Sequence, residues 1–264
     1  MPRKTLREEV KEIKRQLSRL QKRLETLEGR QEVRPAKTRT YIDGFDEIIG
    51  GGISRGHVSL LSGPSGTMKT SIALNMLQRN SKDGRKVLYI TLEETKESLL
   101  ETMRSLGLDA EDADFIVDIG RLRMEHEEVD KTGNWIDVLK DFISKRKRYR
   151  KVELLVIDSL TALYSLTELS DPHKVLFHFF AFLRNLGITS IFIFDSDREG
   201  NYPNREDSIA DASFHVNFQR SPDGSVGLMM RCIKLRHSKH SMDYHELRFE
   251  NGRFSIGPLS SSSP

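Results

Sequence analysis

The sequence predicts an α/β fold with a mostly parallel central sheet, and three observations support this prediction. Stretches rich in strand-forming residues alternate with stretches of helical periodicity between residues 41 and 256. Two strand-like stretches, 153–158 and 190–195, are almost continuously apolar, which is typical of strands buried on both faces. A glycine-containing loop at 63–70 joins one strand to one helix. This alternation predicts helices packed on both faces of the sheet.

Residues 1–30 form the first predicted element, a coiled-coil helix. Its apolar residues repeat at alternating intervals of four and three: Leu6, Val10, Ile13, Leu17, Leu20, Leu24 and Leu27. A period of about 3.5 residues keeps one apolar seam on a supercoiled helix. In a parallel pair, Glu9 would face Lys14 and Arg23 would face Glu28, so both flanking pairs attract. The alternative is a single amphipathic helix lying on its own domain.

A polar linker containing Pro35 is predicted at 31–40, between the coil and an α/β domain at 41–256, and the serine-rich tail at 257–264 is predicted to be disordered. The predicted helices of the domain are 70–78, 96–106, 135–149 and 173–186. Its predicted strands are 57–61, 86–91, 115–118, 153–158, 190–195, 214–219, 227–235 and 246–249. The turn at 221–224 predicts a C-terminal β-hairpin.

The loop after the strand at 57–61 matches the phosphate-binding pattern G-x-x-x-x-G-K-[ST] except that Met68 replaces the second glycine. In such a loop, backbone N–H groups wrap a phosphate, the lysine reaches the terminal phosphates and the hydroxyl binds Mg²⁺. The residues expected to hold a nucleotide are Gly63, Pro64, Ser65, Gly66, Thr67, Met68, Lys69, Thr70 and Ser71. A side chain at position 68 is compatible with binding if it points away from the phosphates. The alternative is a glycine-rich turn with an incidental lysine.

Carboxylates follow two other predicted strands. Asp158 ends a strand that we expect beside the strand of the loop, where it would hold Mg²⁺ together with Thr70. Glu93 and Glu94 follow the strand at 86–91, where one would orient the water that attacks the γ-phosphate and the other would support it. The alternatives are an ordinary strand-end aspartate and a favourable charge pair at a helix N-terminus.

Five stretches together resemble the KaiC family of RecA-type ATPases. They are 44–53, the phosphate-binding loop, 91–95, 156–161 and 233–240. The resemblance covers about 41–256 as a single KaiC-like unit and implies a RecA-like P-loop NTPase core that binds ATP and Mg²⁺. It further implies that Glu93 and Glu94 are catalytic glutamates acting beside Lys69.

The resemblance also implies a role for two cations of a late strand. Lys234 and Arg236 would reach the γ-phosphate across a subunit interface, whereas the alternative is an exposed strand face. The chain departs from the family at Met68 and at His237, where glycine is frequent, and these departures concern the hydrolysis rate and the loop geometry.

These features predict a Mg²⁺-dependent ATPase whose slow hydrolysis cycle is coupled to oligomer assembly or signalling. Two alternatives are a RecA-type recombinase-like protein that binds DNA and a non-hydrolysing, ATP-dependent interaction module. The acidic balance of the loop at 195–208 argues against nucleic acid as a partner. We expect a homo-oligomer in which coiled-coil pairing gives an even-numbered ring, such as a hexamer. An outside protein is the alternative partner of the coil.

The composition favours a reducing, cytoplasmic setting. Cys232 is the only cysteine of the chain, so an intrachain disulfide is excluded. No apolar run approaches the roughly 18–20 residues that cross a bilayer, and the charged N-terminus lacks the apolar core of a signal peptide. The formal net charge of +3 does not by itself indicate nucleic acid binding. We interpret the basic run at 145–151 as a solvated cationic helix end, with phosphate binding as the alternative.

Overall fold

The computed structural model describes Gln16 and residues 37–111, 113–121, 135–167, 169–197, 201–220 and 224–257. The chain divides into two units, 1–36 and 37–264, and the fold below is that of the second. Apart from Gln16, the predicted coiled coil lies outside the described residues, and so does the tail beyond Gly257.

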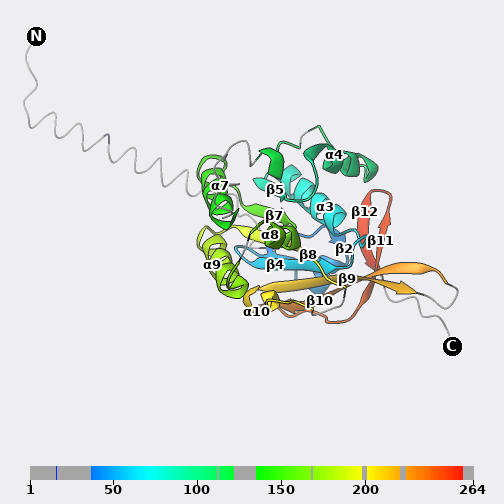
Figure 1. The fold of residues 1–264 in the computed structure, drawn as a ribbon. Coiled ribbons are helices and arrows are strands. Elements are labelled where there is room, and N and C mark those ends of the chain that lie inside the picture. Colours follow the sequence, from blue (N-terminus) through cyan, green and yellow to red (C-terminus); the bar gives the residue numbers. More distant parts are fainter. Residues whose placement is uncertain are drawn as a thin grey trace, which may run out of the picture. The chain divides into compact units, whose positions relative to one another are not determined.

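A ten-stranded sheet runs through the second unit (Figure 1). Six neighbouring strands are parallel, in the spatial order β9 (Ala212–Arg220), β4 (Val58–Gly63), β8 (Thr189–Asp195), β7 (Leu154–Asp158), β5 (Val87–Thr91) and β6 (Ile116–Asp118). Beyond β9 the sheet continues through β10 (Val226–Leu235), β11 (His245–Glu250) and β12 (Arg253–Gly257), which pair antiparallel, and ends at β2 (Ile42–Asp43). The predicted α/β fold with a mostly parallel sheet is confirmed.

Two groups of helices cover the faces of this sheet. One apolar cluster holds residues of α3 (Lys69–Lys82) and α4 (Lys96–Ser105), and a second holds residues of α7 (Trp135–Arg150), α8 (Leu160–Leu166) and α9 (Pro172–Asn185). No helix among the described residues has both the length and the apolar character that a membrane span requires.

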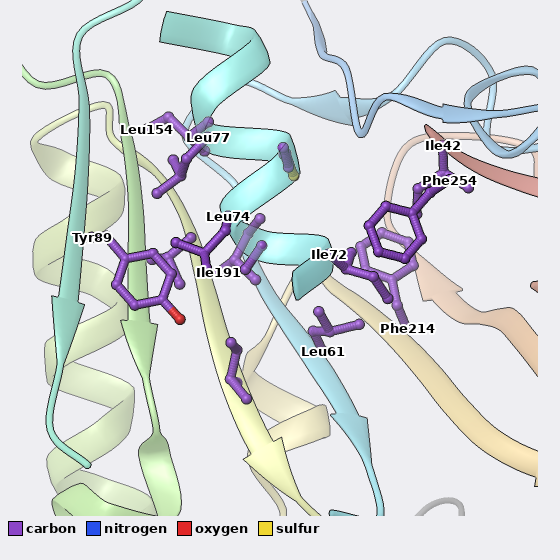
Figure 2. Close-up of a cluster of buried hydrophobic side chains, with 14 of the residues drawn as sticks. Ile42, Leu61, Ile72, Leu74, Leu77, Tyr89, Leu154, Ile191, Phe214 and Phe254 are labelled. Carbon is purple, nitrogen blue, oxygen red and sulfur yellow. The ribbon is translucent and has the colours of Figure 1, made fainter. Parts of the chain in front are cut away.

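Helix α3 is fixed by its apolar side chains against the middle of the sheet. Its buried residues Ile72, Leu74 and Leu77 face side chains from several strands, as Figure 2 shows for Leu61, Tyr89, Leu154, Ile191 and Phe214. Because α3 includes Lys69 and Thr70, the last two residues of the phosphate-binding loop, this packing also holds the loop at the end of β4.

Short elements complete the unit. β1 (Lys37–Thr38) pairs antiparallel with β3 (Ile53–Ser54), while α2 (Phe45–Ile48) and α10 (Glu206–Ile209) are single helical turns. Residues 37–40, which we placed in the linker, are therefore partly folded, and Thr38 and Thr40 are buried. Arg85 holds this segment by donating hydrogen bonds to the Lys37 carbonyl and to the Thr38 hydroxyl.

One expected neighbour relation is wrong. We expected the strand that ends in Asp158 to lie beside the strand of the phosphate-binding loop, but β8 lies between β7 and β4. Asp158 nevertheless reaches the loop, because Thr70 in the first turn of α3 donates a hydrogen bond to its carboxylate.

Candidate functional site

The phosphate-binding loop leaves β4 at Gly63, where the backbone geometry requires glycine. Gly63 has φ +153°, and a Cβ atom there would lie 2.1 Å from the carbonyl oxygen of Val216 on β9. Only a residue without a side chain lets the loop start so close to its neighbour. At the other end of the loop, Met68 precedes α3 and offers no side-chain hydrogen bond to its first turn. The helix therefore begins with N–H groups that suit an anion.

Met68 adopts a left-handed backbone conformation, which glycine adopts most readily. Its φ of +63° and ψ of +23° are left-handed, a region that costs a side-chain-bearing residue about 1–2 kcal/mol. The side chain is partly buried and packs against the apolar cluster under α3, although it also borders the cleft described below.

Lys69 and Thr70 begin α3 and contact two carboxylates. The Lys69 ammonium lies 2.9 Å from Asp195 Oδ1 and donates to the Pro64 carbonyl at 2.8 Å. The Thr70 hydroxyl donates to Asp158 Oδ2 at 2.8 Å. The structure thus brings together the motif lysine, the motif hydroxyl and the strand-end aspartate.

Asp158 is buried and accepts a second hydrogen bond from Tyr89, a fully buried residue of β5. Burial raises the pKa of the Asp158 carboxyl to about 6, the nearby charges of Glu93 and Glu94 act in the same direction, and the two hydroxyl donors oppose them. Burial likewise raises the pKa of Tyr89 well above its ordinary value, so its hydroxyl keeps its proton and remains a donor.

Glu93 and Glu94 follow β5 and are held by different hydroxyl groups. Ser159, directly after Asp158, donates to Glu93, and Ser98 of α4 donates to Glu94 at 2.6 Å. Thr91 fixes the turn between strand and helix, because its hydroxyl accepts from the Glu94 N–H and donates to the Glu94 carbonyl. The two carboxylates thus have separate anchors, one on the β7 side and one on α4.

These groups share one cleft of about 380 Å³. It is lined by Ser65, Gly66, Met68, Lys69, Thr70, Ser71, Glu93, Glu94, Thr102, Asp158, Ile193 and Asp195. Most of the predicted nucleotide-binding residues therefore face one space with both glutamates. Gly63, Pro64 and Thr67 do not line it, and the Thr67 hydroxyl instead closes the loop by donating to the Pro64 carbonyl at 2.7 Å.

Lys234 and Arg236 lie outside this cleft, towards the other end of the sheet. Lys234 is opposite Ser213, which is opposite Leu60, whereas the loop leaves β4 at the far end of that strand. Both cations converge on the segment around α10. The Lys234 ammonium donates to the carbonyls of residues 207 and 210 at 2.7 and 2.8 Å, and Arg236 donates to the carbonyl of residue 208 at 3.0 Å. The two side chains therefore lie together, but not beside the phosphate-binding loop of their own chain.

Sequence reasoning missed two contacts of this site. The hydrogen bond of Tyr89 to Asp158 depends on the pairing of β5 with β7, which no local pattern specifies. The ion pair of Asp195 with Lys69 depends on β8 lying beside β4, where Asp195 is the register partner of Gly63. The signal that could have found Asp195 is its place at the end of an apolar strand, since parallel strands end at one edge.

The sheet, the loop between β4 and α3, and the carboxylates around it define a P-loop protein with a RecA-like fold. The model of the KaiC ATPase family matches residues 38–261, and the chain belongs to this family. The predicted resemblance is thereby confirmed.

The chain is similar to proteins of two sizes. It is 34% identical over 165 residues to the circadian clock oscillator protein KaiC of Rippkaea orientalis, covering 59% of this chain and 31% of that protein. It is 26% identical over 235 residues to a UPF0273 protein of Thermotoga maritima, covering 84% and 96%. A crystal structure of a KaiC-like protein from Pyrococcus horikoshii matches with a TM-score of 0.72 and 24% identity, over 84% and 99% of the two chains. The chain thus spans about a third of the length of the clock protein and nearly all of the other two.

Proposed function

We propose that this chain is a Mg²⁺-dependent ATPase that hydrolyses ATP slowly. The observation that carries the proposal is the 2.8 Å contact of Thr70 with Asp158, in a cleft that also holds Lys69 and both glutamates. Phosphoryl transfer to water requires three kinds of group. They are a lysine that binds phosphate, a hydroxyl and a carboxylate that hold a metal, and carboxylates that orient the attacking water.

The residues present fit Mg²⁺. Thr70 and Asp158 offer hydroxyl and carboxylate oxygens, the hard donors that Mg²⁺ prefers, and Asp158 uses one oxygen for both hydroxyl donors, which leaves Oδ1 for the metal or its waters. Bound Mg²⁺ would supply positive charge to the phosphate oxygens. In this proposal Lys69 binds the terminal phosphates, and Glu93 or Glu94 takes the proton of the attacking water.

The proposed ATPase works as a homo-oligomer. Lys234 and Arg236 lie away from the cleft of their own chain, so they could serve as phosphate-binding cations only in a neighbouring copy. Such cations contribute about 10³–10⁵ in rate where they stabilise the charge of the transition state. A ring, with a hexamer as the expected size, would place one copy's cations against the next copy's cleft. We place it in the cytoplasm, where ATP binding and turnover would time assembly or signalling.

The proposal is tested by binding and phosphate release measured side by side. Lys69→Ala should abolish nucleotide binding, whereas Lys82→Ala, an exposed lysine at the other end of α3, should not. Glu93→Gln combined with Glu94→Gln should bind ATP but release no phosphate, with exposed Glu97→Gln as the matched control. Phosphate release from the double variant at the wild-type rate would remove both glutamates from the mechanism. ATP binding by the wild type without any turnover would favour the non-hydrolysing module.

A further inference from the structure

The lysine of the phosphate-binding loop is already bound to a carboxylate. The Lys69 ammonium contacts Asp195 Oδ1 at 2.9 Å and the Pro64 carbonyl at 2.8 Å. The Lys69 side chain is 6% exposed, so water can replace few of these contacts, whereas that of Asp195 is 39% exposed. Asp195 therefore already binds Lys69, the lysine that the proposed function requires for the terminal phosphates.

The position of Asp195 is set by the sheet. Asp195 ends β8 and is the register partner of Gly63, where the phosphate-binding loop begins. Its N–H donates to the Thr161 hydroxyl at 3.1 Å, and the N–H of Ser196 donates to the Gly63 carbonyl at 3.1 Å. The backbone that carries this carboxylate is thus fixed to the start of the loop, within reach of Lys69.

Asp195 differs from the other carboxylates of the cleft in its partner. Four carboxylates line the cleft, Glu93, Glu94, Asp158 and Asp195, and of the described residues that line it Lys69 alone carries a positive charge. Each of the other three accepts a hydrogen bond from at least one hydroxyl group. Asp195 instead takes the lysine, so it is the carboxylate that competes directly with a phosphate.

We propose that Asp195 sets the affinity and the specificity of the cleft by competing with the phosphates of the ligand for Lys69. An incoming phosphate must either break the ion pair of Lys69 with Asp195 or share Lys69 with the Asp195 carboxylate, which has the same sign of charge as the phosphate. Both weaken binding. A ligand that brings Mg²⁺ compensates the extra negative charge, whereas a free polyphosphate or a metal-free nucleotide does not. Asp195 thus selects Mg²⁺-loaded nucleotides over bare phosphate anions. This inference rests on the proposed nucleotide binding.

The test compares Asp195→Asn, which keeps the shape and removes the charge, with Asp197→Asn, the same change at an exposed position two residues later. Calorimetry on the full-length chain would measure the dissociation constants of a slowly hydrolysed ATP analogue and of tripolyphosphate, each with Mg²⁺ and with a chelator. We expect Asp195→Asn to bind both ligands about three- to tenfold more tightly, because a part-buried ion pair no longer has to be broken. The gain should be larger without Mg²⁺, and Asp197→Asn should match the wild type.

Equal or weaker binding by Asp195→Asn would overturn the inference, because the carboxylate would then position the lysine or the ligand instead of competing. An equal gain with and without Mg²⁺ would overturn the selection for Mg²⁺-loaded nucleotides. If Asp195→Asn does not give a cooperative thermal transition, Asp195→Ser provides the same comparison with a smaller neutral side chain. The proposed function fails separately, if the wild type binds no nucleotide or if Lys69→Ala binds as the wild type does.

Discussion

At the scale of single residues, Met68 combines two opposing contributions to the stability of the loop. Its left-handed backbone is costly for any residue with a Cβ atom, and its side chain recovers part of that cost by packing against the cluster under α3. Glycine at this position would remove both the strain and the packing, whereas alanine would keep the strain and lose most of the packing.

We therefore expect Met68→Gly to be more stable than Met68→Ala by about 1 kcal/mol, which reverses the usual order in helices. For a domain of this size the difference corresponds to about 2–4 °C in Tm. Thermal unfolding of both variants checks this prediction. Met76→Gly and Met76→Ala inside α3 serve as the control pair, in which the alanine variant should have the higher Tm. A more stable Met68→Ala would mean that position 68 is not strained in solution.

Motif residues were predictable at this scale because each is specified by its neighbours in sequence. Lys69 and Thr70 follow a glycine loop that starts a helix, and the structure places both in the cleft. The contacts of Tyr89 with Asp158 and of Asp195 with Lys69 were not predictable, because the pairing of strands far apart in sequence sets them. The place of Asp195 at the end of an apolar strand indicates only the edge of the sheet at which it lies.

At the scale of elements, Asp211 joins three segments that are distant in sequence. Its carboxylate accepts from the N–H of Val58 on β4 at 2.9 Å and from Arg184 of α9 at 2.8 Å, and it lies 3.4 Å from Arg236 after β10. Burial alone would raise the pKa of Asp211, but the hydrogen bonds from Arg184 and Val58, with the nearby positive charge, outweigh it and hold the pKa below its ordinary value.

A carboxyl whose pKa is lower in the folded state stabilises the fold above its unfolded pKa of about 3.9, and this contribution is lost as pH falls through the folded value. We expect Asp211→Asn to be less stable than the wild type at pH 7 and to lose less stability between about pH 5 and pH 3. Urea unfolding across this range checks the prediction, with Asp137→Asn on the exposed face of α7 as the control. Parallel pH profiles for the wild type and Asp211→Asn would show that Asp211 has an unperturbed pKa.

The prediction about the subunit boundary rests on Lys234 at the end of β10 and on Arg236 just after it. Mixing Lys69→Ala subunits with Arg236→Ala subunits should restore part of the ATPase activity that each lacks, because one kind of mixed interface pairs an intact loop with an intact arginine. Phosphate release at several mixing ratios measures this restoration. Replacing the first partner by the double variant Lys69→Ala/Arg236→Ala should abolish it, since no interface is then complete. The absence of restoration in verified mixed oligomers would place Arg236 in its own subunit's function or in none.

Among the elements, the local sequence pattern predicts some strands but not their order in the sheet. Strands β7 and β8 were predictable because both are buried on two faces and read as apolar runs. Their order was not, since crossovers that lead to neighbouring or separated strands have similar sequences. β12 was missed because its five residues, with Arg253 and Gly257 at the ends, lack a strand pattern of their own. Its pairing with β11 is what makes it a strand.

At the scale of the whole molecule, the proposed ring and the predicted coil impose different symmetries. A ring that places the cations of one copy at the cleft of the next needs head-to-tail contacts, whereas a parallel coiled coil joins copies in pairs. An adaptable segment between coil and domain would let neighbouring copies pair while the domains close the ring. Six copies with three coils would satisfy both symmetries.

The coil should therefore matter for assembly and not for nucleotide binding. The segment from Leu6 to Glu28 spans little more than three heptads, so it should pair weakly alone and more strongly when domain contacts raise its effective concentration. Deleting residues 1–30 should shift assembly to higher protein concentration in the presence of an ATP analogue, as measured by light scattering after size exclusion. The dissociation constant of the nucleotide should not change.

Point changes on the full chain separate pairing from the loss of a segment. Leu17→Asn with Leu24→Asn places two polar residues in the predicted seam and should weaken assembly as the deletion does. Ser18→Asn with Glu25→Asn, one position further along the helix and outside the seam, should assemble as the wild type does. Identical assembly of the truncated and full-length chains at all concentrations would instead assign the heptads to a different protein, or to a helix lying on its own domain.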